Sequence, residues 1–228
     1  MASGPVTETR RLEVAPGRFT GWIESFADRH HGLAAAAAGG VVAFTAPDGA
    51  VAECFVPFPP LCRQTLAADD GAEPLDLAKL MTAHAAADRT VGVFLVRLGG
   101  YAAGVFTGAE PGLVASKVGS RLVHGRSAAG GQSQQRFARR RENQAHQALS
   151  AAADTAAAVF GPYKLDALVL GGDKRAFSSI RNDPRLTPFF EAAVESFLTV
   201  PDPRLTVLKD TPRLFRAIKI KLTQPTNN

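Results

Sequence analysis

The chain has 228 residues, of which 46% are hydrophobic and 21% are charged, so it is long enough to bury a globular core. No apolar run reaches the ~18 residues that a membrane span needs, and the first residues lack the charged and apolar regions of a signal peptide. The sequence therefore predicts a cytoplasmic protein without a membrane partner. A net charge of +5 implies only a mild preference for anions.

The first 15 residues show no periodic pattern, and we expect them to be unstructured. Phe19, Trp22, Ile23 and Phe26 then follow the spacing of one helix face, which predicts a helix ending near His30. The runs 41–45 and 51–56 flank a Pro-Asp-Gly turn and predict a hairpin.

The next predicted helix covers residues 75–87. Its inward side chains would be Leu77, Leu80, Met81 and His84, and we interpret His84 as partly buried rather than catalytic. Cys54 and Cys62 could pair or remain reduced, and neither their spacing nor a nearby histidine indicates a metal site. We interpret both as structural thiols.

A second pattern begins at Val91. Residues 91–98 and 101–106 read as two strands joined by Gly99-Gly100, a pair suited to a tight hairpin turn. After a turn at residues 110–112, residues 113–124 read as a third, longer strand. Ser133 is a plausible N-cap for a long helix ending near Phe160. Its predicted inward stripe comprises Phe137, Ala145, Ala148, Leu149, Ala152, Ala156 and Val159.

Gly161-Pro162 would end that helix, and residues 165–170 read as a buried strand. Gly171-Gly172-Asp173 then leads into a short helix at 174–181, where a tight turn is favoured over a phosphate site. Residues 189–198 read as a last amphipathic helix. Residues 207–222 carry Lys209, Arg213, Arg216, Lys219 and Lys221, and predict either a strand and helix that close the fold or a second RNA-facing edge.

These elements predict an α/β protein in which helices pack on a mixed sheet. We divide the chain into an N-terminal α+β unit of unknown role at 1–88 and a second unit at 89–228 that includes the basic C-terminal segment.

The segment from His124 to Arg141 is the most informative part of the sequence. Gly130 and Gly131 lack Cβ atoms and allow the backbone to approach a ligand closely. Gln132 follows, and its amide donates and accepts hydrogen bonds without titrating. Between Lys117 and Gln147 there are seven basic residues and one acidic residue, which is typical of contact with a phosphate backbone.

Gly130-Gly131-Gln132 resembles the Gly-Gly-Gln of class-one translation release factors. The surrounding His124-Gly125-Arg126 and Arg136-Phe137-Ala138-Arg139 resemble the central hydrolytic domain of the archaeal and eukaryotic type. The intervening Ser-Ala-Ala and the Gln-rich helix start are most similar to the actinobacterial branch of the ribosome quality-control release factors. The resemblance covers roughly residues 91–200 and implies a ribonuclease-H-like fold.

The resemblance also implies an activity, hydrolysis of the ester between nascent chain and tRNA in the peptidyl transferase centre. The catalytic residues would be Gly130, Gly131 and Gln132. The RNA-binding residues would be Lys117, Arg121, Arg126, Arg136, Arg139, Arg140 and Arg141. The expected partners are the large ribosomal subunit, its rRNA and the CCA end of peptidyl-tRNA, and we expect a monomer without cofactor or metal.

The sequence departs from the termination factors in two ways. It contains no Asn-Ile-Lys-Ser decoding run, and Ser127, Ala128 and Ala129 are inserted before the Gly-Gly-Gln. We therefore expect a codon-independent factor that acts on stalled ribosomes or on split large subunits.

Two other function classes stay open at this point. One is a ribosome-binding or RNA-binding module of the same fold without hydrolytic activity. The other is a tRNA-cleaving nuclease, because a ribonuclease-H-like fold can hold a metal between carboxylates, although Asp166, Asp173 and Glu191 are scattered along the sequence.

Overall fold

The structure is a computed structural model that describes residues 7–61, 73–97, 99–120 and 133–225, without the side chains of residues 7 and 133–141. The chain forms two compact units, one from Met1–Ala87 together with Phe215–Asn228, and the other from Asp88–Leu214. No helix in the described part of the chain is both long and apolar enough to cross a membrane.

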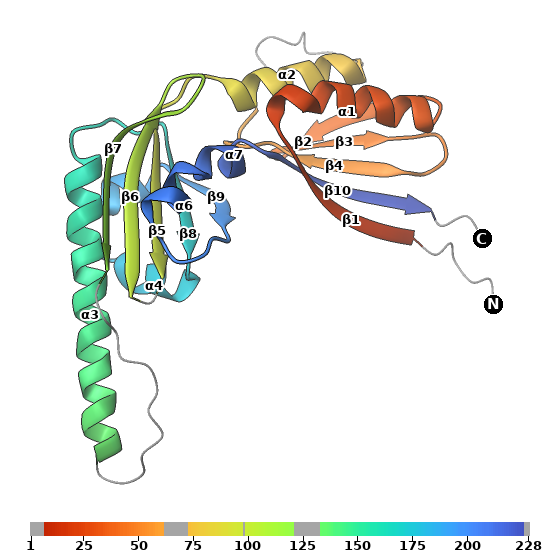
Figure 1. Ribbon diagram of the computed structural model, residues 1–228. Helices are drawn as coiled ribbons and strands as arrows, with labels where there is room; N and C mark the ends of the chain where they lie inside the picture. Colours follow the sequence, from red (N-terminus) through yellow and green to blue (C-terminus); the bar gives the residue numbers. More distant parts are fainter. Residues whose placement is uncertain (1–6, 62–72, 98, 121–132, 226–228) are drawn as a thin grey trace. The chain divides into compact units, whose positions relative to one another are not determined.

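The first unit is an antiparallel five-stranded sheet with two helices on one face (Figure 1). The strand order is β1-β10-β4-β3-β2, with bounds β1 Thr7–Val14, β10 Ile218–Pro225, β4 Val51–Phe55, β3 Val41–Thr45 and β2 Ala34–Ala38. The helices are α1, Pro16–Arg29, and α2, Pro74–Ala86. Phe19, Ile23 and Phe26 of α1 and Leu77 and Met81 of α2 are buried against Phe44 and Ile220 of the sheet, so the predicted helical faces are confirmed.

Three features of this unit differ from the sequence-based expectations. Residues 7–14, expected to be unstructured, form β1, because they pair along their whole length with β10. Strand β2 was not predicted at all, since its five alanines favour a helix in isolation. The C-terminal strand lies between β1 and β4 of the first unit, whereas the division at residue 88 places it with the second.

The second unit contains a mixed sheet in the order β7-β6-β5-β8-β9. Its strands are β5 Val91–Arg97, β6 Gly100–Thr107, β7 Gly112–Ser120, β8 Ala167–Gly172 and β9 Ala193–Leu198. β6 is antiparallel to both of its neighbours, while β8 is parallel to β5 and β9 is parallel to β8. In chain order this is 3-2-1-4-5 with only the second strand reversed, so the mixed, ribonuclease-H-like sheet is confirmed.

Helices cover both faces of this sheet. The long helix α3, Ser133–Phe160, lies along one face and extends beyond the ends of β5, β6 and β7 (Figure 1). Ala148, Ala152, Ala156 and Val159 are buried as predicted, because small side chains let the helix approach the sheet closely. Short helices complete the unit, namely α4 Lys174–Ile180, α5 Thr187–Phe190, α6 Leu205–Lys209 and α7 Thr211–Phe215, which runs into the first unit.

The core beneath α3 is built around Phe94 of the central strand. Its ring makes edge contacts with Phe160 of α3 and Phe177 of α4, at centroid distances of 6.2 and 5.4 Å. The predicted helix at 189–198 is wrong. A four-residue helix ends at Phe190 and residues 193–198 form β9, because the apolar residues there gain hydrogen bonds and burial beside β8.

Candidate functional site

The Gly-Gly-Gln segment joins the edge strand β7 to the long helix α3. β7 ends at Ser120 and α3 begins at Ser133, so the order strand, segment, helix agrees with the prediction. Gly130, Gly131 and Gln132 lie outside the described residues, as do Arg121 and Arg126. The backbone of Arg136, Arg139, Arg140 and Arg141 is helical, and their side chains lie outside the described part of the chain, as does that of Ser133.

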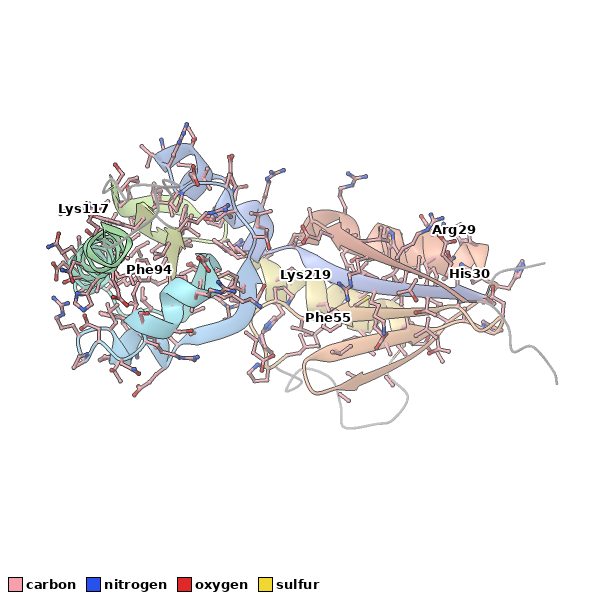
Figure 2. The ribbon with its side chains drawn as sticks, turned by 90° about the horizontal axis from the view of Figure 1, so that it is seen from below. Arg29, His30, Phe55, Phe94, Lys117 and Lys219 are labelled. Carbon is pink, nitrogen blue, oxygen red and sulfur yellow. The ribbon has the colours of Figure 1, made fainter. Side chains whose placement is uncertain are left out.

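Lys117 is the predicted RNA-binding residue whose side chain the structure describes. It is exposed on β7 and lies opposite Ala103 of β6, on the sheet face that α3 covers (Figure 2). Val114 and Val118 of the same strand are also exposed, at 49% and 38%. A cation on this edge can therefore reach an anionic partner beside α3.

The end of β7 is held by a contact that the sequence analysis did not identify. Tyr101 of β6 lies opposite Gly119 of β7, and a Cβ atom on Gly119 would come within 2.4 Å of the tyrosine Cζ and Oη atoms. Gly100 lies opposite Ser120, the last residue of the strand. The tyrosine ring thus occupies the space above the final residues before the Gly-Gly-Gln segment. Gly119 within the predicted strand was the sequence feature that could have indicated a close contact at this position.

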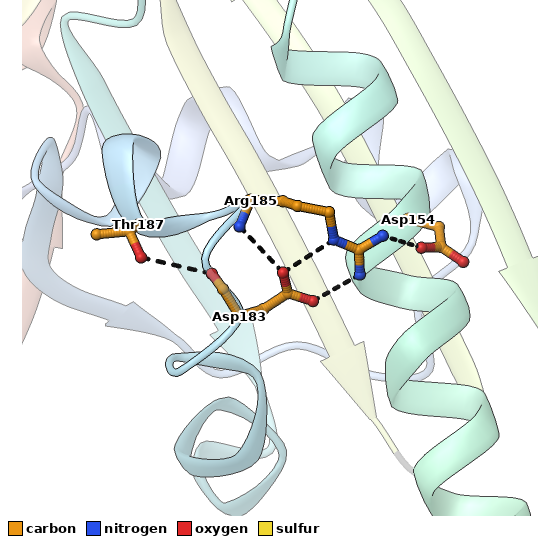
Figure 3. A network of polar contacts seen from close by, with 4 residues as sticks. All are labelled: Asp154, Asp183, Arg185 and Thr187. Atoms are coloured by element: carbon orange, nitrogen blue, oxygen red, sulfur yellow. Dashed lines mark hydrogen bonds and ion pairs between the residues drawn. The ribbon is translucent and has the colours of Figure 1, made fainter.

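A charged cluster attaches α3 to the loop between α4 and α5 (Figure 3). Nε and Nη2 of Arg185 donate to the two carboxylate oxygens of Asp183 at 2.9 and 2.6 Å, and Nη1 donates to Asp154 of α3. The hydrogen bond from the Arg185 side chain lowers the pKa of Asp183, and its bonds to both carboxylates raise the pKa of Arg185. The long helix is therefore held by an ion pair to Arg185 as well as by its buried alanines.

The Gly171-Gly172-Asp173 exit from β8 is a tight turn, as predicted. Gly172 has φ of +105°, and a Cβ there would lie 2.2 Å from the carbonyl oxygen of Val96. This close approach lets the backbone N–H of Asp173 donate to the same oxygen at 2.7 Å. The Asp173 carboxylate then accepts from the backbone N–H of Arg175 at 2.9 Å and caps α4.

The carboxylates considered for a nuclease have structural roles or stand apart. Asp166 accepts a hydrogen bond from the backbone N–H of Thr90 at 2.8 Å, Asp173 caps α4, and Glu191 follows α5. Among the described residues, no group of three His, Cys, Asp or Glu side chains could hold a metal ion. The arrangement of these three acids gives no support to metal-dependent cleavage.

The remaining single residues from the sequence analysis lie in the first unit. His84 is partly buried, as predicted, and its Nε2 atom lies 2.9 Å from the carbonyl oxygen of Phe58. Cys54 is a free, buried thiol whose pKa is raised by burial, which makes it unreactive, while Cys62 lies outside the described residues.

The basic C-terminal segment is divided between different environments. Arg216 is 8% exposed, and its Nη2 atom donates to the carbonyl oxygen of Ala87 at 3.2 Å. Lys221 pairs with Glu53 at 2.6 Å, and Lys219 lies opposite the exposed Phe55 on the neighbouring strand (Figure 2). The segment forms two short helices and a strand, so the prediction that it closes the fold is confirmed for the first unit.

Comparison with solved structures gives two partial matches to named proteins. The "Vms1 mitochondrial localization core" aligns with a TM-score of 0.41 and 13% identity, over 78% of this chain and 75% of that one. The archaeal translation termination factor aRF1 aligns with a TM-score of 0.40 and 12% identity, over 94% of this chain and 68% of that one. No curated protein matches the sequence.

The sequence of the second unit gives the decisive comparison. The model of the family described as "Actinobacteria/chloroflexi VLRF1 release factor" matches residues 89–221, more than half of the chain. The match begins beside β5 and continues into β10, and it therefore spans β7, the Gly-Gly-Gln segment and α3. The chain accordingly belongs to the actinobacterial and chloroflexi VLRF1 family of release factors.

Proposed function

We propose that this protein is a codon-independent peptidyl-tRNA hydrolase that frees nascent chains on stalled ribosomes or split large subunits. The observation that carries the proposal is the family match over residues 89–221, which includes Gly130-Gly131-Gln132 between β7 and α3. Codon independence is proposed because the sequence contains no Asn-Ile-Lys-Ser run.

The proposed reaction is attack of water on the ester carbonyl of peptidyl-tRNA. The C–O bond to the tRNA ribose breaks, a proton passes to the 3′-oxygen, and the products are a peptide carboxylate and intact tRNA. The ester is already activated, and the missing component is a correctly placed water. Placing one reactant in line with the other can lower the barrier by several kcal/mol.

Gln132 would supply that geometry. In our proposal its backbone N–H stabilises the oxyanion that develops on the ester carbonyl, and its side-chain amide orients the attacking water. Gly130 and Gly131 would allow the backbone to approach the terminal adenosine of tRNA. Hydroxyl groups of tRNA and rRNA lie at the reaction centre, so the proposal needs no general base from this protein and no metal or other cofactor.

The basic residues would hold the segment in place. We assign Lys117, Arg121 and Arg126 on one side of Gln132 to phosphate groups of rRNA or tRNA, together with four residues of the first turns of α3, namely Arg136, Arg139, Arg140 and Arg141. α3 has 28 residues and is therefore about 42 Å long. Its C-terminal half is anchored by buried alanines and by Arg185, and in our proposal the N-terminal half contacts RNA.

The partners and setting follow from the same proposal. The protein would act as a monomer in the cytoplasm, where it binds the large subunit and reaches the peptidyl transferase centre and the CCA end.

The experiment that tests the proposal compares wild type with Gln132→Ala on purified ribosome-nascent-chain complexes. The peptidyl-tRNA band is followed by gel electrophoresis, and ribosome binding is followed by sedimentation. Loss of the band with wild type alone, and with intact tRNA as product, supports the hydrolase. Equal binding without release by either protein would instead indicate a binding module, and shortened tRNA would indicate a nuclease.

A further inference from the structure

A small hollow lies at the end of the second-unit sheet where β7 leads into the Gly-Gly-Gln segment. It has a volume of about 190 Å³ and a mostly apolar lining. Its floor comes from Val96 of β5, from Gly100 and Tyr101 of β6, and from Gly99 in the turn between the two strands. Because Gly100 pairs with Ser120, the hollow adjoins the last described residue before that segment.

The hollow exists because its walls carry small side chains. Ala145 and Ala148 of α3 and Ala176 of α4 line it, and Leu149 is the one larger aliphatic residue from either helix. The tight turn at Gly172 brings the start of α4 close to Val96 and so closes one side. Tyr101 is confined by Gly119, so the aromatic side chain in the lining belongs to the same contact that fixes the end of β7.

Charged groups lie where the hollow opens. Nη1 of Arg97 donates to the carbonyl oxygen of Val200 at 2.9 Å, and its Nε lies 3.8 Å from Asp202. Arg175 is exposed, and it lines the hollow. The remaining charge is the Asp173 carboxylate, which caps α4. An anion would therefore approach from the side of Arg175, whereas the carboxylate could accept from an amino group.

We infer that this hollow binds one unstacked nucleotide of ribosomal or transfer RNA, with the base against Tyr101 and Leu149 and the phosphate at Arg175. The inference rests on the proposed function, because that function brings the hollow to RNA. The volume is below the ~300–1,000 Å³ of sites for drug-sized ligands, which restricts the occupant to about one ring system. Bases in single-stranded RNA are recognised by stacking on aromatic and apolar side chains, with basic groups on the backbone.

Two variants change the hollow without touching the Gly-Gly-Gln segment. Ala145→Leu fills it from α3, and Arg175→Glu reverses the charge at its opening. Arg181→Glu is the matched control, since Arg181 is exposed at the other end of α4 and does not line the hollow. Thermal melting followed by circular dichroism checks that each variant keeps its fold.

The first measurement uses nucleoside 5′-monophosphates and the full-length protein in ¹⁵N-labelled form. We expect amide shifts at Gly99, Gly100, Tyr101, Ala148 and Ala176 on titration with a monophosphate, and loss of these shifts in Ala145→Leu. Titration with inorganic phosphate and with the nucleoside alone shows whether the phosphate or the nucleoside part of the nucleotide is recognised. Shifts that are absent, or that persist unchanged in Ala145→Leu, would overturn the inference. This readout does not depend on hydrolytic activity.

The second measurement uses single-turnover release on large subunits that carry peptidyl-tRNA. We expect Ala145→Leu and Arg175→Glu to raise the half-saturating protein concentration about tenfold, and to leave the rate at saturation within about twofold of wild type. Arg181→Glu should match wild type in both values. An unchanged half-saturating concentration in both hollow variants contradicts the inference. If wild type releases nothing, the proposed function fails, and the titration still decides the binding of a nucleotide.

Discussion

The side chain of Tyr101 fills the position that a side chain at Gly119 would occupy, and this contact fixes the strand that leads to Gly130-Gly131-Gln132. A Cβ at residue 119 would lie 2.4 Å from the tyrosine ring, far inside any real contact distance. A side chain at residue 119 would therefore require the ring of Tyr101 to move. The pair lies between β6 and β7, in the antiparallel part of the second-unit sheet. It is close to the end of β7, after which comes the segment that we propose enters the ribosome.

The first prediction concerns this pair. Gly119→Ala should force Tyr101 out of its position and lower the free energy of unfolding by about 1–3 kcal/mol, as overpacking generally does. The matched control is Gly112→Ala in the same strand, where the new Cβ would meet only the carbonyl oxygen of Thr107 at 3.9 Å. Urea unfolding of both variants checks the difference. Equal stability of Gly119→Ala and Gly112→Ala would contradict the proposed contact.

The turn after β8 provides a second test of packing. Gly172→Ala combines a φ of +105° with a Cβ 2.2 Å from the carbonyl oxygen of Val96. We expect a loss of more than about 2 kcal/mol, because the backbone must move and α4 moves with it. Gly100→Ala is the comparison, since its Cβ would make an ordinary 3.5 Å contact with Pro203. Unfolding midpoints that shift equally for both variants would show that the turn is not constrained as described.

Residues that were predicted correctly carried local signals. The helix at Pro16–Arg29 followed from apolar spacing, and the hairpin of β5 and β6 followed from Gly99-Gly100 between two apolar runs. The strand, segment and helix around Gln132 could also be read from the sequence, since a long apolar stripe of alanines begins soon after the arginines.

The misassigned residues depend on distant partners. Ala34–Ala38 form a strand because β3 pairs with them, against the helix preference of alanine. The apolar residues in 193–198 fit the spacing of a helix face as well as the alternation of a strand. The segment forms a strand because it pairs with β8. The contacts between Tyr101 and Gly119 and between Arg185 and Asp154 join residues of different elements, so no local pattern identifies both partners of either contact.

Acid should weaken the attachment of α3 through Asp183. The hydrogen bond from Arg185 lowers the pKa of this carboxyl in the folded state, so its stabilisation is present above the unfolded pKa and is lost as the pH falls through the folded pKa. We expect the unfolding free energy of wild type to fall more steeply below about pH 4 than that of Arg185→Gln. Urea unfolding between pH 3 and 6 tests this, with Arg181→Gln as control. Parallel curves for wild type and Arg185→Gln would rule out the effect.

The arginines at the start of α3 should determine ribosome affinity. Reversing two charges with Arg139→Glu and Arg140→Glu should weaken association and reduce the slope of log affinity against log salt by about 1 to 2, because fewer phosphate contacts release counterions. The double variant is compared with Arg204→Glu, an exposed position at the start of α6. Sedimentation with ribosomes over a salt series gives the slopes. Identical slopes for wild type and the double variant would remove these arginines from the interface.

The most direct test of the account is the rate of peptidyl-tRNA hydrolysis at saturating protein. A quenched-flow experiment on stalled complexes should give a first-order release of peptide with intact tRNA for wild type. Gln132→Ala should bind the same complexes equally well and release peptide at least about a hundredfold more slowly, in line with the loss of one oriented group at a reaction centre. Equal release rates for the two proteins would show that Gln132 does not promote the hydrolysis, and the proposed mechanism would then be wrong.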